Sequence, residues 1–542
     1  MTDLDSPSLM DKLGKTLTFD RAMVAAIVVG VLLRVVAVLM DTPRFDGAFY
    51  STIGYNIVSQ GDYVTLSGIQ TYNFSLTFPA YLASFYAVFG YSIPVTKVAS
   101  FICGLLVILI AYLATKNLFD RRAGLTAAAV MSLTSALIVV TGKNYVENIV
   151  LIFFIPAIWA MIKGFGEPKY IPIAAFFAGL TYYTKTDVGL YIAFAGLGGF
   201  AVWRFLYLRW DVLKDKYYWL AFLIVIAMVL GRALLISSGQ DQYQSLTKTM
   251  LGSFSISVFL VQCVFHLLLV GGFFVFWYPE LRRSLSRYRE ESINFLLLLM
   301  TALALLAVLN ATGWRTFSPR ILAGVSREYI TIIFVPAIWM FFSLARPDEP
   351  SERRGILASI KETLRRKKRL LAFVACLGLA TLMIFVDDWL AVLFFFGAFC
   401  FVFTTFRKRV IILLVAFFVV SANAVTAVYR PAYVEAAEDV NRALQPGQTI
   451  ALDRESGSDY LSPDRIFPFF SVQDIGLVIY ESGSTPDFIM SEMSWTYPGY
   501  TFVAVFDGEA RPTLLSLVKD LILGRDVDPS FPEKNVYLWR LS

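Results

Sequence analysis

The sequence predicts a polytopic α-helical membrane protein, with about 13 transmembrane helices and a C-terminal soluble α/β domain. Of its 542 residues, 57% are hydrophobic and only 16% are charged, and the mean hydropathy is +0.64. These values lie outside the usual range of soluble globular proteins. Apolar runs long enough to cross a bilayer recur from Met23 to Val428, and the pattern changes to short strand-like runs after that point.

Each long apolar run is interpreted as one helix. The runs lie near residues 21–40, 95–115, 123–141, 147–162, 170–184, 187–203, 217–236, 253–276, 293–310, 328–344, 370–386, 389–405 and 410–428. Because the first run belongs to this series, we expect no cleaved signal peptide. The segment Phe78–Gly90 is too short to cross, so it is predicted as an interfacial helix within a first external loop at residues 41–94.

The distribution of basic residues predicts which loops lie on the cytoplasmic side of the membrane. Clusters occur at Lys116/Arg121/Arg122, Arg204/Arg209/Lys214/Lys216, Arg282/Arg283/Arg287/Arg289, Arg353 to Arg369 and Arg407/Lys408/Arg409. A cytoplasmic N-terminus makes every one of them cytoplasmic, and an odd number of spans then places the C-terminal domain outside the cell membrane. The net charge of +6 divides into +14 for residues 1–428, the membrane domain, and −8 for residues 429–542. This division does not favour nucleic-acid binding.

The C-terminal region alternates helix-like and strand-like segments. The expected elements are a helix at Pro431–Leu444, strands at 449–452, 475–480, 488–490 and 500–506, a helix at Pro512–Leu523 and a strand at Val536–Leu541. This is the pattern of a small α/β domain, and it contains no glycine-rich phosphate loop. The nearest approach to a Trp-Trp-Asp motif, Trp495-Thr496-Tyr497, lacks the acid, which argues against an oligosaccharyltransferase.

The cysteines and the single histidine do not form a recognisable metal-binding or catalytic motif. Cys103, Cys263, Cys376 and Cys400 all fall inside apolar runs without metal-ligand spacing, and the single histidine, His266, lies in the middle of a predicted span, where a packed residue is expected. No metal site or resident cofactor is therefore predicted. Carboxylates remain as the acid and base groups for chemistry outside the membrane.

Several basic residues lie at the external ends of the predicted spans, where the topology does not require them. They are Arg44, Lys143, Lys185, Arg232, Lys248, Arg320 and Arg327. Charges at membrane depth are costly and tend to mark function, and Lys and Arg suit the binding of a phosphate at the interface. The alternative is that several of them snorkel or pair with local carboxylates.

Two carboxylates stand out on the same side. Asp46 follows the first span closely, beside Arg44, which should favour its ionised form, so it could serve as a general base. Glu147 opens the fourth span after Lys143-Asn144-Tyr145 and could meet Asp46 across a site. The plainer interpretations are a helix cap for Asp46 and complementation of a helix dipole for Glu147.

An ordered series of short motifs follows the first span. It comprises Asp46 with Tyr50, Gly61-Asp62-Tyr63, Phe78-Pro79-Ala80-Tyr81, Phe89-Gly90 and Asn117 to Gly124. This series resembles the protein O-mannosyltransferases, which form family 39 of the C-type glycosyltransferases and to which the lipid A aminoarabinose transferases are similar. The resemblance is clearest over residues 44–165.

The resemblance implies the C-type glycosyltransferase fold and transfer of a sugar, with inversion, from a dolichyl or undecaprenyl phosphate donor to an extracytoplasmic acceptor. It implies Asp46 as the catalytic base, Glu147 as a second site carboxylate, and Lys185, Arg327 and Tyr329 near the donor phosphate. Two departures from the family pattern, Gly47 after the acid and Phe78 before Pro79, leave open whether the acceptor is protein, lipid or glycan. They also leave open a role for a divalent cation.

A transporter or flippase for a lipid-linked or anionic substrate is the alternative function. Arg34 and Arg232 lie within predicted spans and could line a substrate path. The sequence shows no internal repeat and no matched pair of interrupted helices. A large external loop together with an external domain suits an enzyme acting at the membrane interface better.

Overall fold

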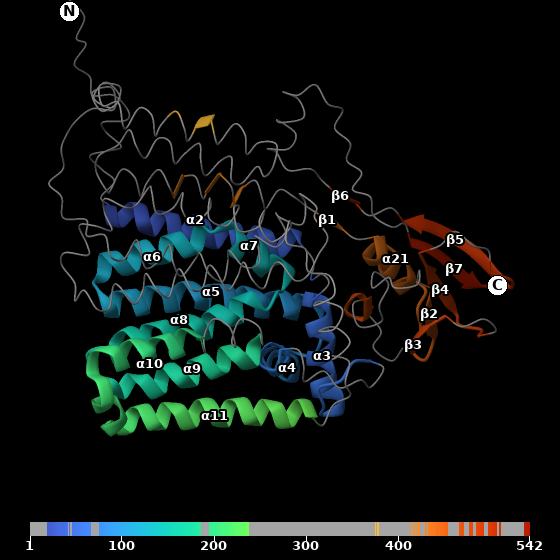
Figure 1. Ribbon diagram of the computed structural model, residues 1–542. Helices are drawn as coiled ribbons and strands as arrows, with labels where there is room; N and C mark the ends of the chain where they lie inside the picture. Colours follow the sequence, from blue (N-terminus) through green and yellow to red (C-terminus); the bar gives the residue numbers. More distant parts are fainter. Residues whose placement is uncertain are drawn as a thin grey trace, which may run out of the picture.

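The computed structural model describes a helical bundle that lies beside a β-sheet (Figure 1). The described residues are 19–41, 43, 46–66, 75–185, 195–237, 429–430, 432–453, 466–470, 476–480, 484–492, 497–506, 509–510 and 536–542, with short pieces at 374, 377–378, 414–415, 418–419 and 421–422.

Four of the described helices are long and apolar enough to cross a bilayer: α2 (Phe19–Met40), α5 (Ile93–Leu118), α8 (Glu147–Gly164) and α11 (Lys216–Ser237). The pair α6 (Arg121–Leu133) and α7 (Ser135–Lys143) would make a fifth span, bent by 53°. Two shorter helices, α9 (Ile171–Thr184) and α10 (Ala195–Leu208), have 14 residues each. The chain is therefore an integral membrane protein.

The predicted spans agree with these helices in position but differ in two details. The single helix expected at 123–141 is broken at Thr134. The helix expected to end at 203 continues to Leu208, and a 3₁₀ segment, η3 (Arg209–Lys214), follows it. The helix expected at 170–184 agrees with α9, which ends where the chain becomes extended at Lys185. Of the six predicted spans after residue 250, the structure describes only short helical pieces within 370–386 and 410–428.

The break between α6 and α7 is stabilised by a buried arginine. Arg34, fully buried on α2, donates from Nη2 to the carbonyl of Met131 at 2.8 Å and from Nη1 to those of Ser132 and Gly30. Ser421 Oγ donates to the carbonyl of Leu133. The last carbonyls of a helix have no partner within it, so these side chains let α6 end inside the bundle.

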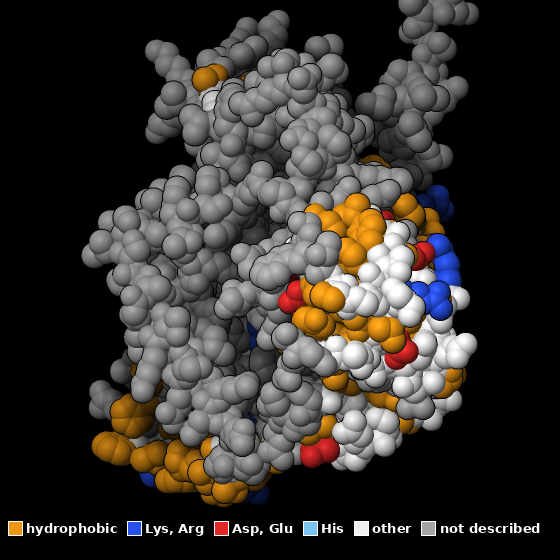
Figure 2. Space-filling model, turned by 90° about the vertical axis from the view of Figure 1, so that its right-hand side faces the viewer, with side chains coloured by type: hydrophobic (Ala, Val, Ile, Leu, Met, Phe, Trp, Pro, Cys, Tyr) orange, Lys and Arg blue, Asp and Glu red, His pale blue; other side chains and the backbone are white. Residues whose placement is uncertain are grey.

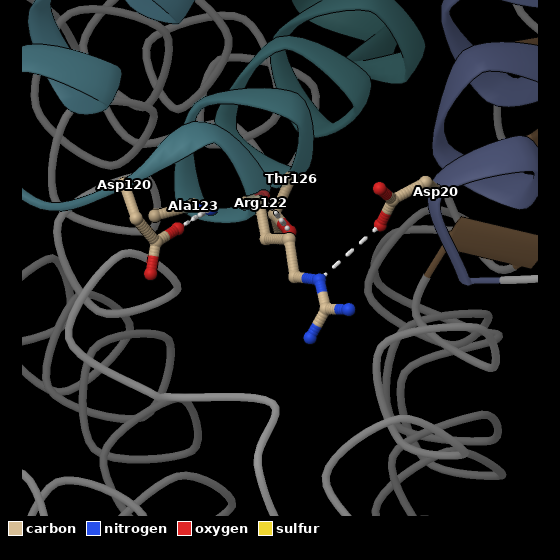
Figure 3. Close-up of polar contacts among 5 residues, drawn as sticks. All are labelled: Asp20, Asp120, Arg122, Ala123 and Thr126. Atoms are coloured by element: carbon tan, nitrogen blue, oxygen red, sulfur yellow. Dashed lines mark hydrogen bonds and ion pairs between the residues drawn. The ribbon is translucent and has the colours of Figure 1, made fainter.

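The opposite end of α6 begins at a cap that belongs to the motif Asn117 to Gly124. Asp120 Oδ1 accepts a hydrogen bond from the backbone nitrogen of Ala123 at 2.8 Å, and Arg122 lies 3.6 Å from Asp20 on α2 (Figure 3). A Cβ at Gly124 would lie 2.9 Å from the carbonyl oxygen of Tyr112, so glycine permits close packing of α5 against α6. This motif therefore shapes a helical hairpin.

The predicted first external loop, residues 41–94, contains two helices, α3 (Asp46–Gln60) and α4 (Thr77–Phe89). The predicted short helix at Phe78–Gly90 is thus confirmed. Tyr63 of the Gly-Asp-Tyr motif donates its hydroxyl proton to the carbonyl of Leu76 at 2.8 Å, and Asn56 Nδ2 donates to the carbonyl of Val64 at 2.8 Å. These bonds tie the loop between α3 and α4 to both helices.

The C-terminal region forms a five-stranded sheet in the order β3-β2-β4-β7-β5. Its strands are β2 (Thr449–Asp453), β3 (Gly476–Ile479), β4 (Phe488–Ser491), β5 (Tyr500–Phe506) and β7 (Val536–Leu541), close to the predicted positions. Both neighbours of β2 are parallel to it, and β7 is antiparallel to β4 and β5. A two-stranded ladder joins β1 (Tyr429–Arg430) to β6 (Glu509–Ala510). The predicted helix Pro512–Leu523 lies outside the described residues.

One face of the sheet packs on α21 (Ala432–Asn441) and on the start of α3. Ala48 of α3 is fully buried in the same hydrophobic cluster as Ile450 and Met490. Phe467, in the 3₁₀ segment η5 (Phe467–Phe469), has its ring centroid 5.1 Å from Tyr55 and 5.9 Å from Tyr91. In Figure 1, α3 and α4 accordingly lie at the end of the bundle nearest α21.

Candidate active site

The start of α3 lies directly against the turn between α7 and α8. Asn144 adopts the left-handed conformation, with φ of 58°, and its buried side chain donates to the carbonyl of Gly47 and to Ser51 Oγ, each at 3.1 Å. A Cβ at position 47 would overlap the carbonyl oxygen of Lys143. Gly47 therefore permits the close approach that holds the exposed Asp46, the first residue of α3, beside this turn.

Gly47→Ala is expected to destabilise the protein by about 1–3 kcal/mol, because the added methyl group must push α3 away from the turn. Thermal unfolding of purified protein would measure this effect. Gly198→Ala is the matched control, since no atom lies within 4 Å of a Cβ at Gly198. Equal unfolding temperatures for the two variants would contradict the close approach at Gly47.

Glu147, the first residue of α8, pairs with Lys185 at the end of α9. The Nζ atom of Lys185 donates to Oε1 of Glu147 at 2.8 Å, with 3% of the Glu147 side chain and 20% of the Lys185 side chain exposed. The second oxygen of Glu147, Oε2, is buried and has no hydrogen-bond partner among the described residues. The pair thus keeps one oxygen available as an acceptor inside the site.

The end of α9 is anchored to two other elements. The backbone nitrogen of Leu76 donates to the carbonyl of Tyr183 at 2.9 Å, and the hydroxyls of Thr77 and Thr184 lie 2.6 Å apart. On α11, the fully buried Arg232 donates to the carbonyl of Tyr182 and lies 5.0 Å above that ring. These contacts fix the backbone that carries Lys185.

Tyr50 packs against the first turn of α4. Its ring, buried on α3, meets Phe78 edge-on at a centroid distance of 5.6 Å. Phe78 precedes Pro79 in the motif Phe78-Pro79-Ala80-Tyr81, and its backbone nitrogen donates a hydrogen bond to Ser75 Oγ at 3.2 Å. Tyr50 therefore links α3 to α4 beside the same helix ends.

The structure brings together the starts of α3, α4 and α8 and the end of α9, and with them five of the predicted site residues: Asp46, Tyr50, Lys143, Glu147 and Lys185. Arg232 lies behind Lys185, bonded to the backbone. The other predicted residues, Arg44, Lys248, Arg320, Arg327 and Tyr329, lie outside the described residues. Within the described part, no group of three or more His, Cys, Asp or Glu side chains could hold a metal ion.

Gly47 and Asn144 are not among the predicted site residues, although both position the start of α3. Asn144 is fully buried, and among the described residues it is the only residue other than glycine with a positive φ. An asparagine just before a helix start is a weak signal for such a turn, because asparagine tolerates this conformation better than most residues. Nothing local indicates that α3 would pack on the turn.

The comparisons with known proteins agree with this architecture. The family described as dolichyl-phosphate-mannose-protein mannosyltransferase matches residues 75–233. The crystal structure of ArnT from Cupriavidus metallidurans bound to undecaprenyl phosphate is similar with a TM-score of 0.57 at 15% identity, covering 96% of this chain and 98% of that one. The apo structure of the same protein gives a TM-score of 0.54 at 15% identity, covering 95% and 97%. No curated protein matches the sequence.

The matched segment, residues 75–233, contains Glu147, Lys185 and the helix ends that surround them. The structural similarity extends over nearly the whole chain. The predicted resemblance is thereby confirmed: the chain has the membrane fold of the C-type glycosyltransferases, and its residues 75–233 match the dolichyl-phosphate-mannose-protein mannosyltransferases.

Proposed function

We propose that this protein is an integral membrane glycosyltransferase that transfers a sugar, with inversion, from a polyprenyl phosphate to an acceptor on the extracytoplasmic side. The observation that carries the proposal is the meeting of three helix ends: Asp46 begins α3, Glu147 begins α8, and Lys185 follows α9. Two carboxylates and a lysine thus gather at the end of the bundle that contacts the sheet. The family match and the shared fold support the same function.

The chemistry follows from the charges. A lipid phosphate leaves as an anion that needs no proton, so fixed cations such as Lys185 assist its departure. The attacking group of the acceptor must lose a proton, and Asp46, which is exposed at the start of α3, is the base in this proposal. Glu147 orients Lys185 through the 2.8 Å contact. The sugar carbon would lie between the base and the cations, as in-line displacement requires.

The transporter alternative loses its main motivation. It rested on the intramembrane residues Arg34 and Arg232, and both donate to backbone carbonyls near helix ends. A buried arginine bonded in this way stabilises a helix terminus. Because each arginine has this structural role, neither one is evidence for a substrate path through the membrane.

The function is tested by incubating the purified protein with membrane extract and a panel of radiolabelled dolichyl and undecaprenyl phosphate sugars. Incorporation of label from at least one donor, dependent on the protein, is the expected result. Facilitated movement of the labelled lipid across vesicles without any incorporation would instead support the flippase alternative.

The proposed topology has about 13 spans, a cytoplasmic N-terminus and an extracytoplasmic domain at residues 429–542. The ends of α5 and α8 and the starts of α6 and α11 carry basic residues away from the sheet, which supports this orientation. Two single cysteines, Lys214→Cys and Val503→Cys, would be placed in a background that lacks the four native cysteines. Both positions are exposed.

An impermeant thiol reagent added to intact cells is expected to label Val503→Cys, and to label Lys214→Cys only after the cells are opened. Labelling of both positions from the same side would overturn the topology.

A further inference from the structure

The C-terminal region packs against the helix that carries the proposed base. Ala48 lies two residues after Asp46 on α3, has no exposed surface, and belongs to the hydrophobic cluster between α21 and the sheet. Every other buried member of that cluster among the described residues comes from positions 432–538. The first turn of α3 is therefore part of the core of the C-terminal region, although its neighbours in the chain belong to the membrane part.

The N-terminal part of α3 is held from two directions. Gly47 and Ser51, four residues apart, contact the buried Asn144 through its hydrogen bonds to the Gly47 carbonyl and to Ser51 Oγ, each at 3.1 Å. Ala48 and Tyr55, seven residues apart, contact the C-terminal region instead. Residues four or seven apart lie on one side of a helix, so each pair forms one face. The helix start thus lies between the membrane part and the C-terminal region.

One aromatic side chain makes the contact with Tyr55. Phe467 is 2% exposed, and its ring centroid lies 5.1 Å from that of Tyr55 and 5.9 Å from that of Tyr91, which precedes α5. Its neighbour Phe469 belongs to the cluster around α21, and the carbonyl of Phe469 accepts a hydrogen bond from Asn441 Nδ2 at 2.7 Å. The segment η5 is therefore fixed to the C-terminal region, while the ring of Phe467 reaches the membrane part.

The bilayer does not fix the position of α3. The helix has 15 residues and is not among the described helices long enough to cross a membrane, so its position depends on the contacts of its sides. A general base must lie at the right place relative to the proton that it accepts, and a displacement of about 1 Å can lower the rate by roughly 10²-fold. We propose that the C-terminal region positions Asp46, and that Phe467 is the positioning residue, acting through α3. This inference rests on the proposed function, since it concerns the base of the transfer reaction.

The proposal separates the base from the donor site. Lys185, which is proposed to contact the donor phosphate, follows α9, and the end of that helix is anchored by Thr77 of α4 and Arg232 of α11. Loss of the Phe467 contact should therefore slow the transfer step, which needs Asp46, without changing donor binding.

The contact is tested first without reference to activity. A spin label on Asp46→Cys, in full-length protein that lacks the four native cysteines, reports the motion of the start of α3 by electron paramagnetic resonance. Phe467→Ala is expected to increase the mobility of the label, because α3 loses its contact with η5. Identical spectra with and without this change would refute the positioning contact.

Phe502→Ala is the matched control for this measurement. Phe502 lies on β5 and is 47% exposed, and its ring contacts Trp539 on the face of the sheet opposite to α3. Figure 2 views the molecule from the side of the sheet and shows exposed hydrophobic side chains on that surface. The control removes one aromatic ring from the same region but not from the contact with α3, so label mobility and transfer should be unchanged. An equal effect of both changes would reject Phe467 as the positioning residue.

Single-turnover transfer, counted per donor-binding site, tests the effect on the base. Phe467→Ala is expected to lower turnover about tenfold with an unchanged Kd for the donor. Phe467→Leu keeps most of the apolar volume and should recover most of the turnover. Unchanged turnover in Phe467→Ala, or an equal loss of donor binding, would contradict the proposal.

A double variant distinguishes positioning from a general loss of stability. A residue that acts through Asp46 has nothing further to lose in Asp46→Asn, so adding Phe467→Ala should leave the residual transfer rate unchanged. A further tenfold loss in that background would overturn the proposal. If Phe467→Ala does not fold, Tyr55→Ala removes the same contact from the side of α3 and has the same expected outcomes.

Failure of the proposed function gives a different result. A wild-type protein that transfers no sugar from any donor, or an Asp46→Asn enzyme with near-normal transfer, would contradict the assigned reaction or base and leave the spin-label result standing. An unchanged label in Phe467→Ala, with Asp46→Asn still strongly impaired, would contradict the positioning role and leave the proposed function untouched.

Discussion

Asp46→Asn is expected to lower turnover by roughly 10²–10⁴-fold with donor binding largely retained. Asp46 opens α3, and the start of that helix is held by the contact of Gly47 with Lys143 and by the hydrogen bonds from Asn144. A carboxylate placed so firmly can act as a base without moving. Asparagine keeps the size and most hydrogen bonds of aspartate but has no basicity. The rate of the transfer step should therefore fall, while donor binding should not.

Single-turnover transfer and donor binding would be measured separately for this variant. Asp62→Asn is the matched control, because Asp62 lies in the same loop and its Oδ1 accepts a hydrogen bond from the backbone nitrogen of Tyr63 at 2.7 Å, which asparagine can preserve. Near-normal transfer by folded Asp46→Asn would mean that Asp46 only caps α3, since asparagine caps helices as well as aspartate does. Glu147 would then be the next candidate for the base.

Lys185→Met is expected to reduce both stability and donor use. It leaves the carboxylate of Glu147, whose side chain is 3% exposed, without the contact at 2.8 Å. Breaking a buried ion pair by removing one partner costs about 3–5 kcal/mol of unfolding free energy. The missing charge-assisted contact to the donor phosphate should weaken donor use by a further 2–4 kcal/mol, as an order-of-magnitude estimate.

The double variant Lys185→Met with Glu147→Gln separates these two effects. It should regain most of the lost stability, because no unpaired charge remains, and it should still use the donor poorly. Lys169→Met is the control: Lys169 pairs with Glu167 at 2.7 Å, but both side chains are more than half exposed, so a change of no more than about 1 kcal/mol is expected. Recovery of donor use in the double variant would show that Lys185 does not bind the phosphate.

Much of the fold could be predicted from local patterns. The helices α2, α5, α8 and α11 and the short helix α4 fall close to the expected positions, because a long apolar run in a membrane must satisfy its backbone within the same segment. The strands β2, β4, β5 and β7 also agree within about one or two residues, because alternation along a strand is a local property. Asp46, Glu147 and Lys185 could be singled out for a similar reason, since a charge beside an apolar run is visible in the sequence.

The local pattern of the sequence therefore predicts which segments enter the membrane, which form strands and which charges lie at the ends of spans. It does not predict that Glu147 pairs with Lys185, 38 residues away, that α3 packs on the turn at Asn144, or that Arg34 reaches the end of α6. The pairing of Asp453 with Ser491 at the end of neighbouring strands is also visible only in the folded chain. The physical reason is that transfer of a segment from water depends on its own residues, whereas these contacts depend on the close approach of segments far apart in the chain.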